Sequence, residues 1–211
     1  MKKYIERFHY LTQDLPHRSH TAQVQLACES GAKWIQYRCL SKGDHQLIPE
    51  IEEIAAICDD WGTTLILTDH AHLLDRIDAQ GVHIEDMAAD FSRIREQIGD
   101  GKTLGASANT FEQIQRIAES GVVDYIGCGP FALTQTKPND LPLLGTAGYE
   151  LLVQRMADAG IEIPLIAVGG IQIADVDGLL KTGVYGIAVS AAVNLRDDPQ
   201  RAYEEFYHKI Y

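Results

Sequence analysis

Polar side chains end several short apolar runs of the sequence, and their types suit the binding of phosphates. The residues that end three of these runs are Gln36 and Arg38, Thr68 and Asp69, and Ser107. Arginine can pair with phosphate oxygens through two parallel hydrogen bonds. A cation at the end of a buried run needs an anionic partner, so we expect Arg38 to bind an anion. A structural ion pair is the alternative.

Two later stretches carry the chemistry of a phosphate cradle. Gly169 and Gly170 follow one apolar run, and glycines let backbone N–H groups approach an anion without side-chain obstruction. Ser190 ends the next run and adds a hydroxyl. We expect the two stretches to bind one phosphate together. The alternative is that the glycines only make a tight turn.

The segment 127–145 is long for a connection between a strand and a helix. It contains two hydroxyls and a cation that suit phosphate oxygens, on Thr134, Thr136 and Lys137. A loop of this kind can close over a substrate. The alternative is a solvated surface insertion.

Two carboxylates, Asp69 and Asp86, follow neighbouring apolar runs and are candidate ligands for Mg²⁺ between the protein and substrate phosphates. For Asp69, a helix N-cap is an equally weighted alternative. His83 is interpreted as a hydrogen-bonded interior residue, with a catalytic base as the alternative. No Ser-His-Asp or Cys-His arrangement stands out, so the pattern favours electrostatic catalysis by positioning over covalent catalysis.

The elements that position these residues alternate between apolar runs and amphipathic stretches. Eight runs are predicted as strands, at 6–12, 33–38, 64–68, 81–84, 103–106, 124–127, 163–168 and 185–189. Helical segments are expected at 47–61, 110–121, 145–160, 173–182 and 199–211. The pattern indicates an α/β fold in which residues 1–211 form a single (β/α)8 TIM-barrel domain. An open doubly wound sheet is the competitor, but its usual GxGxxG motif is missing.

Composition limits the partners of the chain. With 18 basic and 30 acidic residues in 211, the formal charge is −12, which argues against nucleic acid as a partner. The N-terminus does not read as a secretory signal and no apolar run is long enough to span a bilayer, so we expect no membrane partner and a cytoplasmic location. The four cysteines, Cys28, Cys39, Cys58 and Cys128, lack metal spacing and are predicted to be free thiols.

The segment 124–139, DYIGCGPFALTQTKPN, resembles the DYIGxGPxxxTxTK segment of the thiamine-phosphate synthase (thiamine-phosphate pyrophosphorylase) family. IPLIAVGGI and GVYGIAVSAAV are similar to that family's later phosphate-loop strands, and the similarity runs over essentially the whole chain. The resemblance implies a transferase that joins hydroxymethylpyrimidine diphosphate to thiazole phosphate, giving thiamine phosphate and pyrophosphate. It also implies a dissociative mechanism assisted by Mg²⁺.

Residue by residue, the resemblance implies that Gln36 contacts the pyrimidine and that Arg38 and Lys137 bind the diphosphate. It implies that Asp69 binds Mg²⁺ and that Ser107 contacts the pyrimidine diphosphate. The residues that it places around the thiazole phosphate are Thr134, Gln135, Thr136, Gly170, Val189 and Ser190. A homo-oligomer is compatible with the resemblance.

The chain departs from the family pattern in the half that would hold the diphosphate. Leu40 stands where the pattern has a lysine, and Lys42 can replace that cation only if the loop swings inward. Thr68 stands where the pattern has asparagine, which leaves a single hydroxyl for pyrimidine recognition.

The family's His-Leu-Gly-x-x-Asp reads His-Ile-Glu-Asp-Met-Ala at 83–88. Ungapped alignment therefore puts Ala88 at the second metal ligand, whereas a loop shorter by two residues puts Asp86 there.

Two other functions stay open beside the synthase. A related thiazole tautomerase needs a histidine where this chain has Asn109. The other is a non-catalytic binder of thiazole or thiamine phosphate, which would account for the departures from the family pattern at Leu40, Thr68 and Ala88.

Overall fold

The computed structural model describes residues 3–134 and 141–211, and eight parallel strands in it close into a barrel. The strands are β1 (Phe8–Leu11), β2 (Trp34–Tyr37), β3 (Thr64–Thr68), β4 (Gly81–Ile84), β5 (Thr103–Ala108), β6 (Tyr125–Cys128), β7 (Leu165–Val168) and β8 (Gly186–Val189). Consecutive strands pair, and β1 pairs with β8 in parallel register. The predicted (β/α)8 barrel is confirmed, and each predicted run contains or overlaps one strand.

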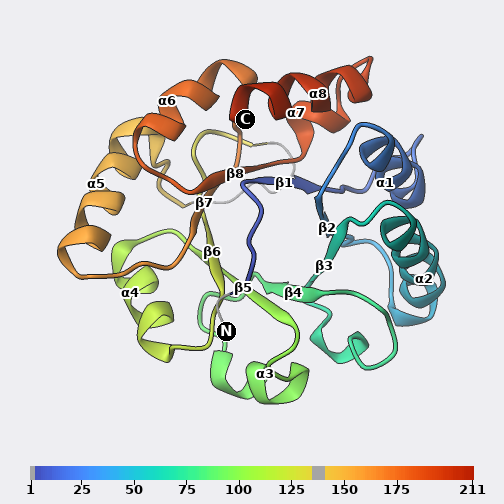
Figure 1. Ribbon diagram of the computed structural model, residues 1–211, viewed down its shortest axis with the longest axis horizontal. Coiled ribbons are helices and arrows are strands. Elements are labelled where there is room, and N and C mark those ends of the chain that lie inside the picture. Colours follow the sequence, from blue (N-terminus) through green and yellow to red (C-terminus); the bar gives the residue numbers. More distant parts are fainter. Residues whose placement is uncertain (1–2, 135–140) are drawn as a thin grey trace.

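The helices surround the barrel as an outer ring (Figure 1). They are α1 (His20–Glu29), α2 (Asp44–Asp60), α3 (Phe91–Ile98), α4 (Phe111–Ser120), α5 (Gly145–Asp158), α6 (Val176–Lys181), α7 (Ala191–Asn194) and α8 (Pro199–Ile210). Two single turns of 3-10 helix, η1 (Ala71–Leu73) and η2 (Ile173–Asp175), complete the elements in the described ranges. The five helical segments predicted from the sequence did not include α1, α3 or α7.

Local sequence explains where α4 begins and ends and which face of α2 is buried. The Thr110 side chain accepts from the backbone N–H of Gln113, and the Gln113 side chain accepts from the N–H of Thr110, so α4 begins with a capping box. The helix ends at Gly121, which takes the left-handed conformation. In α2 one face is buried, through Leu47, Ile51, Ile54, Ala55 and Cys58.

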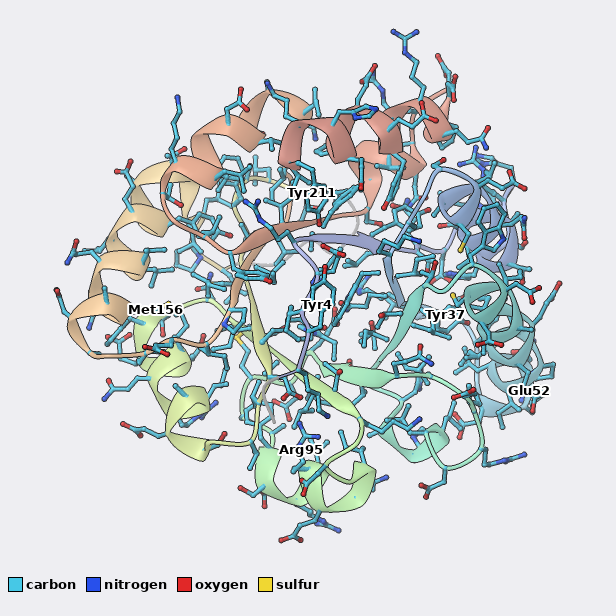
Figure 2. All side chains as sticks on the ribbon, viewed as in Figure 1. Tyr4, Tyr37, Glu52, Arg95, Met156 and Tyr211 are labelled. Carbon is cyan, nitrogen blue, oxygen red and sulfur yellow. The ribbon has the colours of Figure 1, made fainter. Side chains whose placement is uncertain are left out.

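The barrel interior is filled by large side chains toward the amino ends of the strands. Trp34, Tyr125 and Ile166 pack there with Ile5 from the segment before β1. That segment crosses the end of the barrel nearest the viewer in Figures 1 and 2, where Tyr4 lies over the opening. Tyr185 Oη donates to the Ile5 carbonyl at 2.7 Å and holds the segment in place. Open space inside the barrel is therefore found toward the opposite end.

The sequence also made predictions about the cysteines and about membrane-spanning segments. All four cysteines are free thiols and all are buried, as predicted. Within the described ranges, no helix combines the length and the apolar character needed to cross a membrane.

Gly105 of β5 tests how tightly the barrel interior is packed. An added Cβ would overlap the Tyr125 ring and would lie 2.6 Å from His83 Nδ1. We expect Gly105→Ala to lower the free energy of unfolding by about 1–3 kcal/mol, because the side chains around it have no room to move aside. Gly178 in α6 is the matched control, since its added Cβ would meet nothing closer than Thr146 Oγ1 at 4.0 Å.

We expect Gly178→Ala to raise the free energy of unfolding by about 0.5–1 kcal/mol, the usual gain of alanine over glycine inside a helix. Urea denaturation of both variants measures the difference. Equal stabilities for the two variants would contradict this account of the interior.

Candidate active site

A cavity opens at the carboxyl ends of the strands, where barrels of this type carry their active sites. The predicted site residues that line it are Gln36, Arg38, Ser107, Thr134, Gly169, Gly170, Val189 and Ser190. Thr68, Asp69 and Asp86 do not line it. Gln135, Thr136 and Lys137 lie outside the described residues, so their predicted roles stay predictions. The two ends of the predicted site, near Arg38 and near Ser190, thus share one cavity.

Arg38 is the cation of this cavity in the described part of the chain. It follows β2, and its Nε donates to Glu85 Oε1 at 2.8 Å. The residue is only 8% exposed, yet its Nη2 atom is buried without a hydrogen-bond partner. Buried donors are nearly always paired, so this atom needs an explanation. The alternative to anion binding was a structural ion pair. Arg38 does form one with Glu85, but only through Nε, and Nη2 stays unpaired.

Arg95 shows what a purely structural buried arginine looks like in the same fold. Its guanidinium donates to the carbonyls of Val122, Gly99 and Lys102 and to Asp124 Oδ2, at 2.6 to 3.2 Å. All three nitrogens of its side chain are used. The unpaired Nη2 of Arg38 therefore marks a guanidinium that is not fully satisfied by the protein.

A chain of hydrogen bonds orients the hydroxyl of Ser107. His83 Nδ1 lies 3.1 Å from Tyr125 Oη, and His83 Nε2 lies 3.0 Å from Ser107 Oγ. His83 is thus a buried, hydrogen-bonded interior residue, as predicted. On the neighbouring strands, Gln36 Nε2 donates to Thr68 Oγ1 at 3.0 Å. Thr68 therefore orients the amide of Gln36 at the edge of the cavity.

Another part of the cavity wall is built from the turns after β7 and β8. Gly169 and Gly170 both take positive φ, and a Cβ on Gly170 would lie 2.6 Å from the Ala132 carbonyl oxygen. The glycines therefore make the turn and also let the segment after β6 approach closely. Ser190 Oγ donates to Gln13 Oε1 at 2.9 Å, just before the first turn of α7.

The two predicted metal ligands lie at the ends of β3 and β4. Asp69 is exposed, has φ of 59°, and accepts from the backbone N–H of Glu85 at 2.7 Å. It does not cap a helix, because η1 is preceded by His70; the N-cap alternative is wrong. Asp86 is exposed and accepts from the N–H of Ala88 at 2.8 Å.

The cation missing at Leu40 is not replaced from the same loop. Leu40 is 65% exposed and does not line the cavity. Lys42 Nζ lies 2.7 Å from Glu50 Oε1 of α2, and this hydrogen bond raises the pKa of Lys42. Lys42 is thus held against α2 rather than at the cavity.

Sequence analysis missed Asp14, which holds the loop that follows Arg38. Its carboxylate accepts from the Leu40 N–H at 2.9 Å and the Ser41 hydroxyl at 2.9 Å, and lies 3.2 Å from Cys39 Sγ and 3.0 Å from His20 Nε2. Burial opposes the ionisation of Asp14, but these hydrogen bonds outweigh it and lower its pKa to about 2. No local motif announces this role, because Asp14 lies far from residues 39–41 in sequence.

Comparison with known proteins places these features in a family. A family model described as thiamine monophosphate synthase matches residues 10–193. The chain belongs to the thiamine monophosphate synthase family. Members of this family condense pyrimidine and thiazole phosphates to thiamine phosphate.

Individual relatives and solved structures agree with this assignment. The chain is 34% identical to the thiamine-phosphate synthase of Flavobacterium psychrophilum over 97% of its length and 98% of that protein. It is 34% identical to the thiamine-phosphate synthase of Phocaeicola vulgatus over 86% of each chain. Its fold matches thiamine phosphate pyrophosphorylase from Pyrococcus furiosus with a TM-score of 0.82 and 26% identity, covering 96% of this chain and 95% of that one.

We expect Asp14→Asn to lower the free energy of unfolding by about 1 kcal/mol at pH 7, after allowance for solvent screening of this partly exposed carboxylate. The pKa of Asp14 is about 2 in the folded chain, below its ordinary value of 3.8. Its charge therefore stabilises the fold above about pH 4, and that contribution is lost as the pH falls toward 2.

Urea denaturation of the parent and the variant between pH 2 and 7 measures this loss. The exposed carboxylate Asp59 of α2 supplies the control, Asp59→Asn. A stability gap for Asp14→Asn that stayed constant down to pH 2 would contradict the assigned role.

Proposed function

We propose that the chain condenses hydroxymethylpyrimidine diphosphate with thiazole phosphate inside the cavity at the carboxyl ends of the strands. The products are thiamine phosphate and pyrophosphate. One observation carries the proposal: Arg38, with its buried unpaired Nη2, lines the same cavity as Gly170 and Ser190. One cavity therefore offers groups for two phosphorylated partners, which supports a reaction that condenses them.

The diphosphate is assigned to the side of the cavity that carries Arg38. There the guanidinium offers charged donors for phosphate oxygens. Gln36, oriented by Thr68, contacts the pyrimidine, and the Ser107 hydroxyl, oriented by His83, contacts the pyrimidine diphosphate. Lys137 is proposed as a second cation for the leaving group.

The thiazole phosphate is assigned to the turns after β7 and β8. Gly169 and Gly170 leave the backbone accessible, and Ser190 adds its hydroxyl. Val189 and Thr134 line the same cavity. Gln135 and Thr136 are proposed to complete the contacts from the segment that follows Thr134.

We propose Mg²⁺ as the cofactor, with Asp69 and Asp86 as its protein ligands. Carboxylate oxygens are the donors that this hard cation prefers, and both residues are exposed at adjacent strand ends, where a hydrated ion can reach them. Bound Mg²⁺ would neutralise charge on the departing diphosphate. Hydrogen bonds to the N–H groups of Glu85 and Ala88 orient the two carboxylates.

The proposed mechanism is dissociative, and the apolar part of the cavity suits it. Pyrophosphate leaves the pyrimidine methylene first, and the thiazole nitrogen then captures the resulting cation. Leu11, Ile166 and Val168 line the cavity, and their apolar side chains would exclude water that would otherwise trap this cation. His9 also lines it; burial lowers its pKa to about 3, so it adds no positive charge at neutral pH.

The contacts of Asn109 give no support to the tautomerase alternative. Asn109 Nδ2 donates to the Gly129 carbonyl at 2.8 Å and to that of Pro142 at 3.2 Å, so this amide serves to hold loops together. An amide does not replace an imidazole as a base. A cytoplasmic location and a homo-oligomer stay predictions.

The first experiment mixes the purified chain with both substrates and Mg²⁺. We expect thiamine phosphate and pyrophosphate in equal amounts, and loss of turnover when EDTA removes the metal. Chromatography of thiamine phosphate and an enzymatic pyrophosphate assay measure the two products. Binding of thiazole phosphate without any product would favour the non-catalytic binder instead.

The second experiment separates the two ends of the cavity by their Michaelis constants. We expect Arg38→Gln to raise the KM for the pyrimidine diphosphate by roughly 10- to 100-fold, because a charged hydrogen bond is lost. We expect Ser190→Ala to raise the KM for thiazole phosphate by about fivefold. Each variant should leave the other KM within about twofold.

Ser92→Ala, at an exposed position of α3, is the matched control for Ser190→Ala. If Arg38→Gln and Ser190→Ala changed the same KM, the assignment of the two substrates to separate parts of the cavity would be wrong.

A further inference from the structure

We propose that Glu85 is a built-in competitor of the diphosphate for Arg38, so that it weakens diphosphate binding and speeds the departure of pyrophosphate. This inference rests on the proposed function, because it assigns a specificity role within the same site. Nothing in the family pattern supplies a carboxylate here, since the pattern has glycine at the position of Glu85 in ungapped alignment.

The first support is the ion pair itself. Glu85 Oε1 lies 2.8 Å from Arg38 Nε, and the two side chains are 18% and 9% exposed. Both residues line the cavity. Charged hydrogen bonds at such low exposure are stronger than those at the surface, so an incoming anion must compete with a real interaction.

The second support is that Glu85 is held in place. Its backbone N–H donates to Asp69 Oδ1 at 2.7 Å, which ties the end of β4 to the end of β3. Glu85 directly follows β4, and both it and His83 of that strand line the cavity. The carboxylate is therefore directed into the barrel mouth by the fold.

The third support is the shortage of positive charge beside Arg38 among the residues that the structure describes, 3–134 and 141–211. Leu40 replaces the family lysine, and Lys42 is bound to Glu50. A diphosphate that reaches Arg38 meets one guanidinium already half neutralised by Glu85. Either the anion displaces Glu85 from Nε, or it binds at Nη2 with the carboxylate still beside it. Both outcomes weaken the affinity.

The same competition acts on the product. Pyrophosphate carries the charge that Arg38 attracts, so it too either displaces Glu85 or binds with the Glu85 carboxylate beside it. The carboxylate is attached to the chain next to its partner and has a high effective concentration, so it returns to Arg38 as pyrophosphate leaves. The thiazole phosphate is assigned to Gly170 and Ser190, and the Ser190 hydroxyl donates to Gln13 rather than to Glu85. The effect should therefore fall on one substrate only.

The test measures binding of inorganic pyrophosphate with Mg²⁺ by calorimetry. We expect Glu85→Gln to bind pyrophosphate roughly tenfold more tightly than the parent chain, because it keeps the hydrogen-bond acceptor and removes the charge. The KM for the pyrimidine diphosphate should fall and inhibition by pyrophosphate should strengthen. The KM for thiazole phosphate should stay unchanged. Glu52→Gln is the control, since Glu52 is an exposed carboxylate at the outer rim of α2 (Figure 2).

Unchanged or weaker pyrophosphate binding in Glu85→Gln would overturn the inference, because Glu85 would then hold Arg38 in place or bind the metal. Thermal unfolding checks that the variant is folded, and Glu85→Ala replaces it if it is not. Absence of pyrophosphate binding in every variant would also overturn it. Tighter binding by Glu85→Gln without any thiamine phosphate from either chain would support the inference and reject the proposed function.

Discussion

Closure of the eight-stranded sheet is the constraint on which every feature of the site depends. Because β1 pairs with β8, the ends of β2, β4, β7 and β8 surround one opening instead of lying along an open edge. Arg38, Glu85, Gly170 and Ser190 each follow one of these strands. At the opposite opening, Ile5 of the segment before β1 packs into the barrel, and its carbonyl accepts from Tyr185.

Among the described residues that line the cavity, Arg38 is the one lysine or arginine, so anion binding there depends on its guanidinium. The chain carries a net charge of −12, and Arg38 is a buried cation whose protein partners do not satisfy it. Arg95, equally buried, is saturated by carbonyls and Asp124 and has a purely structural role. The difference between the two arginines lies in their hydrogen-bond partners, and it is the reason that Arg38 is the one proposed to bind a ligand.

The sequence predicted the parts of the structure that depend on local patterns. The strand runs, the capping box at Thr110 and the turn at Gly170 follow from periodicity, cap chemistry and glycine geometry. The contacts of Asp14 and Glu85 join segments far apart in the chain, and no local rule predicts them. Glu85 directly follows β4, and continuing the alternation of β4 puts it on the same face as His83, a signal in the sequence that was not used. Asp69 was misjudged as a potential cap because its left-handed backbone turns it toward β4.

A crystal structure of the chain with Mg²⁺, pyrophosphate and thiazole phosphate is the most direct test of the claim that one cavity holds both anionic groups. The account predicts pyrophosphate in contact with the Arg38 guanidinium and thiazole phosphate against the turns at Gly170 and Ser190, facing each other across the same space. Pyrophosphate bound at a separate surface, with Arg38 still paired only to Glu85, would contradict it.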